Sequence, residues 1–267
     1  MPGFFEQMCK VIAASERQHS GIAPDSDAMR RFMSEIPVQQ NSCTAAADIV
    51  PQTTQNSAVP VSPAITPPPA SGNFATLDEI TSAVLNCSRC PLCRTRTNPV
   101  PGEGNPDARL MFIGEGPGFD EDIQGRPFVG KAGQLLDKMI SAMQFSREEV
   151  YITNIVKCRP PDNRVPTPEE AQCCMGYLKR QIELIRPEVI VLLGATAVKY
   201  LLNVTNGISK MRGRWLSYEN IPVMATFHPA FLLRQESAKR ETWNDLQQVM
   251  ARFGKFHKPQ RNGVSPR

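Results

Sequence analysis

A short apolar run that ends in a glycine-rich loop most constrains how this chain can fold. Residues 110–113 read Leu-Met-Phe-Ile, and the loop that follows, residues 114–118, reads Gly-Glu-Gly-Pro-Gly. An apolar run of this length that stops at glycine is typical of a buried strand in an α/β sheet. Ligands of such sheets bind at the carboxyl ends of the strands. The loop is therefore the first candidate for a functional site.

The spacing of the glycines argues against a dinucleotide site in this loop. It is G-x-G-x-G, which matches neither the G-x-G-x-x-G fingerprint nor a Walker loop. Acidic side chains also lie in the loop or directly after it, at Glu115, Asp120, Glu121 and Asp122. Carboxylates this close together would repel a pyrophosphate.

Strands and helices alternate along the rest of the chain. Apolar runs predict further strands at residues 150–155, 189–193 and 223–226. Alternation of this kind indicates a mainly parallel sheet with helices on both faces, an α/β fold. Helical spacing and N-cap residues predict the helices at 76–85, 131–144, 167–185, 195–202 and 241–253.

The chain divides into four parts by composition. The pattern of residues 1–36 predicts two short amphipathic helices, which we interpret as a docking segment for a partner protein. A weakly ordered tail is an equal alternative. Residues 37–73 are rich in Pro, Ala and Ser and predict a disordered linker. The folded domain is expected over residues 74–254, and residues 255–267 form a basic, loose tail.

Composition limits the location and partners of the protein. The chain has 267 residues and a formal net charge of +4, which permits nucleic acid binding without requiring it. No apolar run approaches the length of a membrane span, and the N-terminus is a poor signal peptide. We therefore expect a cytoplasmic protein, without a membrane partner and monomeric.

The cysteines predict a metal centre. Cys87, Cys90, Cys158 and Cys174 form a C-x2-C pair followed by a distant C-x15-C pair. A structural zinc site and a four-thiolate iron–sulfur cluster fit this spacing equally well, and unrelated thiols are the remaining alternative. Cys93 and Cys173 are neighbours of the set, whereas Cys9 and Cys43 lie in the N-terminal part and are expected to be free.

Three polar landmarks fall at the carboxyl ends of predicted strands. They are the loop around Glu115, Asn154 and His228. In a parallel sheet these ends share one edge, so the three are expected to form one site.

Several motifs occur together in a fixed order. They read Cys-Ser-Arg-Cys-Pro-Leu at 87–92, Gly-Glu-Gly-Pro-Gly at 114–118, Gly-Arg-Pro-Phe-Val-Gly at 125–130, Thr-Asn-Ile-Val-Lys-Cys-Arg-Pro-Pro at 153–161 and Phe-His-Pro-Ala at 227–230. In this combination the chain resembles the bacterial and archaeal family 4 uracil-DNA glycosylases over about residues 76–253. The resemblance implies a three-layer α/β/α fold with a four-stranded parallel sheet. It also implies hydrolysis of the N-glycosidic bond of deoxyuridine in DNA and a [4Fe-4S] cluster on Cys87, Cys90, Cys158 and Cys174.

The resemblance implies roles for the residues at the strand ends. A base in a duplex must be flipped into a pocket before it can be cut. There the Asn154 amide suits uracil, because it can donate to O4 and accept from N3–H. Phe128 would stack on the base, and His228 would stabilise the departing uracil anion. Gly114 and Gly116 would offer backbone groups to uracil and water.

Two roles are less specified by the motifs. Glu115 is the candidate for positioning or activating the attacking water, with Asp122 as the second choice. The side chain that excludes thymine is left open, since Phe119 and Asp120 occupy positions that vary in the family.

DNA contacts are expected from the loop after His228 and from residues near the cysteines. This loop, which carries Leu233 and Arg234, wedges into the minor groove in similar enzymes, and binding should weaken steeply with salt. The candidates for phosphate contacts are Lys157, Arg159 and Arg164.

The rival interpretations share the fold but differ in activity. The main alternative is a noncatalytic DNA- or polymerase-associated iron–sulfur protein that works through its N-terminal part. A covalently trapping relative is disfavoured, because residues 125–130 lack the basic, histidine-containing insertion of that type. The third alternative is a structural protein that carries zinc.

Overall fold

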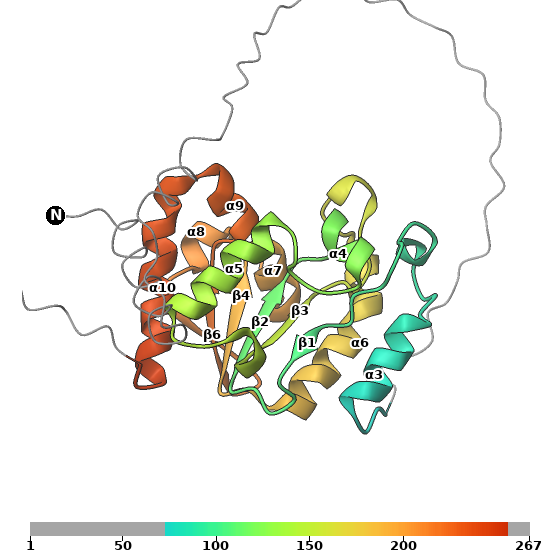
Figure 1. The fold of residues 1–267 in the computed structure, drawn as a ribbon, viewed down its shortest axis with the longest axis horizontal. Helices are drawn as coiled ribbons and strands as arrows, with labels where there is room; N and C mark the ends of the chain where they lie inside the picture. The colour runs from blue at the N-terminus through green and yellow to red at the C-terminus, as the bar shows by residue number, and fades with distance from the viewer. Residues whose placement is uncertain (1–72, 256–267) are drawn as a thin grey trace, which may run out of the picture. The chain divides into compact units, whose positions relative to one another are not determined.

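The computed structural model describes residues 73–255, which form the coloured ribbon in Figure 1. The predicted helices in residues 1–36, most of the predicted linker and nearly all of the basic tail lie outside the described residues. Cys9 and Cys43 do so as well.

A six-stranded sheet in the order β1-β3-β2-β4-β6-β5 forms the centre of the domain. Its four inner strands are parallel, as the sequence predicts; they are β3 (Tyr151–Asn154), β2 (Leu110–Gly114), β4 (Val189–Leu193) and β6 (Ile221–Thr226). Two antiparallel edge strands, β1 (Glu103–Gly104) and β5 (Trp215–Tyr218), were not predicted. The sheet is therefore mixed at its edges and parallel where it carries the predicted site.

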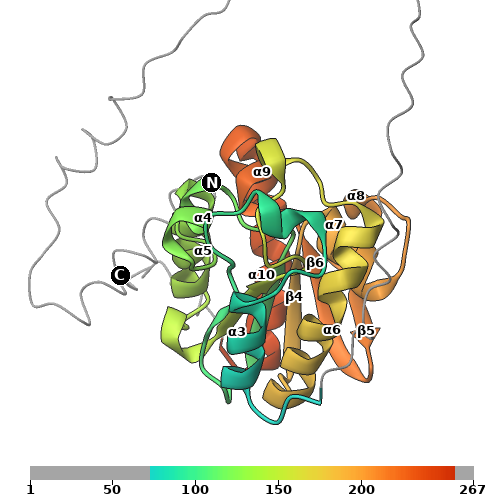
Figure 2. The ribbon, with the colours of Figure 1, turned by 90° about the vertical axis from the view of Figure 1, so that its right-hand side faces the viewer.

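Helices cover both faces of the sheet, which confirms the α/β prediction (Figure 2). Along β2, Met111 and Ile113 pack with α6 (Pro168–Ile185) and α7 (Ala195–Leu202). Leu110 and Phe112 point to the other face and pack with α5 (Lys131–Ala142) and α10 (Lys239–Arg252). This alternation follows from the two-residue period of a strand, and the strand is buried throughout because both faces are covered.

Two helices begin at the capping residues that the sequence indicates. Thr76 Oγ1 accepts from the Glu79 N–H at the start of α3 (Leu77–Leu85), which packs against α6. At the start of α6, Thr167 Oγ1 accepts from the Glu170 N–H, and Glu170 Oε2 accepts from the Thr167 N–H in return. Each pair satisfies N–H groups that have no partner within the helix.

Short elements lie beyond the carboxyl ends of the parallel strands (Figure 1). They are α4 (Phe119–Gln124) after β2, η3 (Pro161–Asn163) after β3 and α9 (Pro229–Arg234) after β6. The segment after His228 was predicted to be a loop, and this is wrong. It is helical because the His228 ring accepts from the Ala230 N–H and Pro229 occupies the first turn. The remaining short elements are η1 (Pro91–Arg94), η2 (Arg147–Glu149), α8 (Ile208–Met211) and η4 (Glu236–Ala238).

Among the helices of residues 73–255, none is both long and apolar enough to cross a membrane.

Candidate active site

A pocket of about 490 Å³ opens at the carboxyl edge of the sheet. Glu115, Asn154 and His228 all line it, so the three strand-end landmarks do come together. Of the other residues predicted for this site, Gly116, Phe128 and Arg234 line the pocket, whereas Gly114, Leu233 and Arg159 do not.

Asn154 ends β3 and is almost fully buried, at 1% exposed. Its side-chain Oδ1 has no hydrogen-bond partner in the protein. A buried acceptor without a partner carries a free-energy cost of about 1–3 kcal/mol, so such atoms usually face a ligand or water. The pocket therefore holds a preformed acceptor for a ligand N–H group.

Gly114 leaves room for this amide. A Cβ atom at position 114 would lie 2.4 Å from Asn154 Oδ1 and 2.5 Å from the ring of Phe128. Gly116 is similarly restricted, because a Cβ there would lie 2.7 Å from a methyl group of Val156. The loop therefore needs glycine at both positions to bring its backbone close to the pocket.

Two aromatic rings form one side of the pocket. Phe128 and His228 have ring centroids 5.6 Å apart, with the ring planes inclined by 31°. Phe128 has a left-handed backbone with φ of 52°, which is rare for a bulky residue. A flat ring at this place suits stacking on a nucleobase.

His228 is held as a neutral hydrogen-bond donor. Burial and, to a smaller extent, the nearby Arg234 lower its pKa to about 4, and Glu121 opposes the shift. Its Nδ1 accepts from the Ala230 N–H at 3.1 Å, so the ring proton resides on Nε2. The structure thus specifies a tautomer that the sequence could not.

Glu115 is held in place by α7 and by the segment after β3. Its carboxylate accepts from the Thr196 hydroxyl at the start of α7, and its backbone carbonyl accepts from the Val156 N–H. The carboxylate is consequently oriented at the pocket wall, where it can accept a proton or a hydrogen bond from water.

The other acids of the glycine-rich segment have structural partners. Asp122 does not line the pocket, since both of its oxygens accept from the Thr97 N–H; the second choice for the water-positioning acid is therefore wrong. Glu121 does line the pocket, and its carboxylate accepts from the N–H groups of Gly118, Val129 and Gly130. Sequence reasoning gave Glu121 no role. Its spacing three residues after the helix N-cap Gly118 was the available signal.

Phe119 and Asp120, the variable positions for which the sequence assigned no role in thymine exclusion, do not line the pocket. The Phe119 ring is 58% exposed and lies 5.1 Å from the Arg159 guanidinium. The Asp120 carboxylate lies against Gly130, where a Cβ would be 2.4 Å from its Oδ2.

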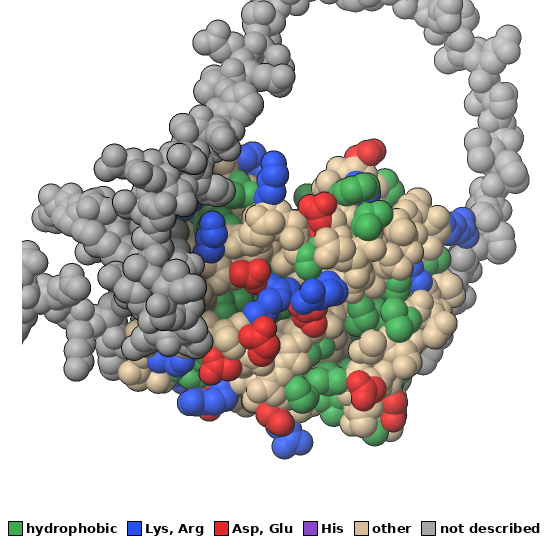
Figure 3. Space-filling view, viewed as in Figure 1, with side chains coloured by type: hydrophobic (Ala, Val, Ile, Leu, Met, Phe, Trp, Pro, Cys, Tyr) green, Lys and Arg blue, Asp and Glu red, His purple; other side chains and the backbone are tan. Residues whose placement is uncertain are grey.

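Of the residues predicted to contact DNA, Arg234 and Arg164 line the pocket. Leu233 is 46% exposed at the end of α9, next to Arg234. Arg159 lies outside the pocket lining and donates to Asn163 Oδ1, whereas Arg164 lines the pocket and pairs with Glu170. On the face seen in Figure 3, basic and acidic side chains lie side by side over its middle, so that region is no uniform basic patch.

Lys157 is not available for a phosphate contact, and that prediction is wrong. The side chain is 1% exposed and its Nζ donates to Thr153 Oγ1, Gln181 Oε1 and the Asn154 carbonyl. These three acceptors satisfy all three N–H groups of the ammonium, which is why the lysine is tolerated in the interior.

A second cavity is lined by cysteines. Besides the predicted Cys87, Cys90, Cys158 and Cys174, the neighbours Cys93 and Cys173 also border it, and the described cysteines form no disulfide. No three His, Cys, Asp or Glu side chains in residues 73–255 lie close enough together to hold a metal ion. The thiols therefore share a cavity without forming a closed coordination sphere.

The surroundings of these thiols are basic. Arg96 donates to Cys158 Sγ at 2.9 Å and to the Cys87 carbonyl at 2.8 Å. Burial raises the pKa of the Cys90 thiol to about 11 and that of the Cys174 thiol to about 12. A set of soft sulfur ligands without carboxylate or imidazole, next to an arginine, fits a negatively charged iron–sulfur group better than a hard cation.

Comparison with known proteins agrees with this geometry. Residues 101–247 match the model of the uracil DNA glycosylase superfamily. A type-4 uracil-DNA glycosylase of Archaeoglobus fulgidus is 44% identical over 187 residues, which cover 67% of this chain and 94% of that protein. The corresponding protein of Thermotoga maritima is 47% identical over 178 residues, covering 65% and 88%, and that of Saccharolobus solfataricus is 45% identical over 182 residues, covering 65% and 84%.

The family match spans the strands, the glycine-rich loop and the pocket, and the relatives share the domain nearly end to end. The chain therefore belongs to the uracil DNA glycosylase superfamily.

Proposed function

We propose that this protein removes uracil from DNA by hydrolysing its N-glycosidic bond and leaving an abasic site, the first step in base excision repair of deaminated cytosine. The buried, unpaired Asn154 Oδ1 in the pocket carries this proposal. Uracil presents an N3–H donor to such an acceptor, whereas cytosine presents another acceptor at N3. Cytosine would leave both atoms unpaired, and buried polar mismatches of this kind discriminate strongly.

The other pocket residues supply the steps of cleavage. A flipped uracil stacks on Phe128 while the Asn154 amide reads its edge. As the bond between C1′ and N1 breaks, the electron pair stays on uracil, and the neutral His228 donates Nε2–H to the oxygen O2 that gains negative charge. Glu115 orients the water that attacks C1′ and accepts its proton. All four residues line the same pocket.

Release of uracil from a defined oligonucleotide tests the proposal. Purified protein should release free uracil from a duplex with one uracil opposite guanine and should leave thymine and cytosine in place. Strand scission at the resulting abasic site by alkali gives the readout. A protein that binds the uracil duplex without releasing the base would support the noncatalytic alternative instead.

We also propose that Cys87, Cys90, Cys158 and Cys174 hold a [4Fe-4S] cluster. The six cysteines in the lining of the second cavity, which contains no carboxylate or imidazole, and the arginine beside Cys158 support this assignment. The group, when bound, would cross-link the segment between α3 and η1, the segment after β3 and α6, and it would thereby stabilise the surroundings of Asn154. None of the steps above uses it.

Loss of one cysteine should remove iron from the protein. Cys158→Ala is expected to lower the iron and sulfide content per chain and to reduce the melting temperature, because a ligated metal centre stabilises only the folded state. Cys9→Ala, outside the described residues, serves as the matched control. Unchanged iron content in the Cys158 variant, or zinc in place of iron, would contradict the assignment.

Arg234 is proposed to contact a DNA phosphate at the mouth of the pocket. Arg234→Gln should weaken DNA binding and reduce the slope of log Kd against log salt by about 1, because one counterion fewer is released. Arg109→Gln is the control, because Arg109 pairs with Glu188 and does not line the pocket. An unchanged salt slope in the Arg234 variant would exclude the phosphate contact.

We further propose a cytoplasmic, monomeric protein, as the sequence predicts. A protein partner for residues 1–36 stays a prediction. Deletion of residues 1–72 with retention of all co-purifying proteins would exclude that partner.

A further inference from the structure

The segment of residues 126–130 that carries Phe128 has an unusual backbone. Phe128 has a φ of 52°, and a residue of this kind persists in the left-handed region only where its surroundings hold it there. The ring of Phe128 is 5% exposed and lines the pocket. Whatever fixes the Phe128 peptide therefore also fixes the ring on which a base would stack.

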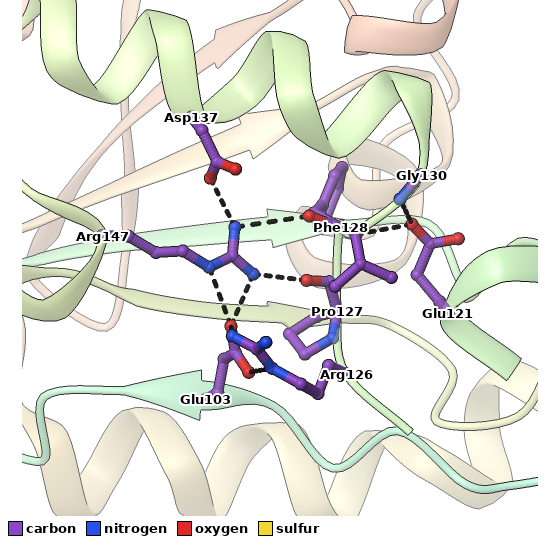
Figure 4. A network of polar contacts seen from close by, with 9 residues as sticks. Glu103, Glu121, Arg126, Pro127, Phe128, Gly130, Asp137 and Arg147 are labelled. Atoms are coloured by element: carbon purple, nitrogen blue, oxygen red, sulfur yellow. Dashed lines mark hydrogen bonds and ion pairs between the residues drawn. The ribbon is translucent and has the colours of Figure 1, made fainter. Parts of the chain in front are cut away.

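Arg147 of η2 forms hydrogen bonds to the backbone carbonyls of this segment (Figure 4). Its guanidinium donates to the Pro127 carbonyl at 2.5 Å and to the Phe128 carbonyl at 3.3 Å. It also donates to Glu103 Oε1 through two nitrogens, at 2.6 and 2.8 Å, and to Asp137 Oδ1 at 2.6 Å. These contacts use all five N–H groups of the guanidinium, and the side chain is 17% exposed.

The far side of the same segment is held by Glu121. Its Oε1 accepts from the Val129 N–H at 2.8 Å and from the Gly130 N–H at 2.9 Å. Figure 4 shows Arg147 and Glu121 approaching the chain from opposite directions. Gly133 of α5 completes the enclosure, because a Cβ there would lie 1.9 Å from the Phe128 carbonyl oxygen.

Arg126 takes part in the network without touching this peptide. It pairs with Glu103 at 2.7 Å, but its side chain is 58% exposed and donates to neither carbonyl. Arg126 and Arg147 thus share the carboxylate of Glu103 and differ in contact with Phe128. This difference supplies a control of equal charge.

We propose that Arg147 is a positioning residue for base excision, which acts by holding the Phe128 peptide so that the phenyl ring forms a fixed platform under the flipped base. The inference rests on the proposed function and adds to it a positioning residue that lies outside the pocket. Arg147 is absent from the pocket lining, and among its hydrogen-bond partners only Phe128 lines the pocket. Its effect on catalysis must therefore pass through Phe128.

Single-turnover excision by variants of the full-length protein tests the proposal. Arg147→Gln is expected to slow the maximal rate by about tenfold to a hundredfold, since small displacements of a positioning group cost this much. Arg147→Lys should be slowed as well, because an ammonium keeps the charge but cannot reach Glu103, Asp137 and both carbonyls. Arg126→Gln loses the same charge and should stay within about twofold of the wild-type protein.

A double-mutant cycle separates positioning from general stability. In a Phe128→Ala background, Arg147→Gln should slow excision by no more than about a further twofold, because the platform is already gone. If Arg147→Gln slows the Phe128→Ala protein as much as it slows the wild type, the proposal is overturned.

Amide hydrogen exchange provides a readout that needs no activity. Arg147→Gln and Arg147→Lys should speed exchange at Val129 and Gly130, whereas Arg126→Gln should not. Unchanged exchange in the Arg147 variants would overturn the proposal, and this result does not depend on excision activity. Failure of the wild-type protein to release uracil would, by itself, refute only the proposed function. Faster exchange with an undiminished excision rate would overturn the positioning role.

Discussion

Replacing Asn154 by leucine is expected to lower kcat/KM for uracil excision by about a thousandfold. Two buried hydrogen bonds to uracil are lost, each worth about 2 kcal/mol, and about 1.4 kcal/mol corresponds to a factor of ten in rate. Leucine nearly matches asparagine in size, so the pocket keeps its shape. Steady-state excision of a uracil-containing duplex measures the effect.

The stability of the same variant is the control. Asn154 Oδ1 has no partner in the protein, so its removal breaks no hydrogen bond of that atom in the folded state. The melting temperature of Asn154→Leu should therefore equal or exceed that of the wild-type protein. Excision within about tenfold of wild type would show that another group reads the base.

Replacing His228 by alanine is expected to lower kcat by about a hundredfold while KM changes little. The Nε2–H group stabilises negative charge that develops on uracil only as the bond breaks, and such interactions appear in kcat. His228 also caps α9 through Nδ1, so alanine removes two functions at once. His228→Asn separates them, because asparagine is a good N-cap but is too short to replace the Nε2 donor.

Uracil excision should be slow in both variants, but only the alanine variant should have a lower free energy of unfolding, by about 1 kcal/mol. Single-turnover rates and thermal melts of the two proteins measure this difference. A fast His228→Asn enzyme would show that His228 serves the helix and not the reaction.

The lowered pKa of His228 also predicts how excision and stability depend on pH. Burial, followed by Arg234, lowers the pKa to about 4, so the ring is neutral from pH 6 to 8 and excision should not follow a His titration there. Because the unfolded state binds the proton more tightly, the stability contributed by His228 is fully present above about pH 6.5 and is lost as the pH falls towards 4. The pH dependence of unfolding should weaken over this window in His228→Asn.

The inner sheet and the pocket follow from local sequence patterns. The runs at β2 and β4 are apolar because both faces of the sheet are covered, and each ends at a glycine. Asn154 is the last residue of β3 and His228 lies two residues after the end of β6, so the shared edge of these parallel strands places them together. This reasoning needs only strand direction and polarity.

Local sequence patterns do not predict side-chain contacts between segments that are separated in the chain. Lys157 looks like a surface lysine in the sequence, but Thr153 and Gln181 satisfy its ammonium inside the domain. Asp122 lies next to Glu121 in the chain, yet the helical turn directs the two carboxylates to different partners. Strand β1 has only two residues and therefore carries no periodic signal at all.

The two short edge strands have a consequence for the protein in concentrated solution. Within the described residues the sheet ends on β1, with two residues, and on β5, with four. An unpaired strand edge can recruit a strand from another molecule, and long flat edges do so best. Here the long parallel strands are all interior, and β1 contains Gly104 with φ of 131°, which interrupts a regular edge. The architecture thus limits edge-to-edge aggregation while leaving the carboxyl edge open for substrate.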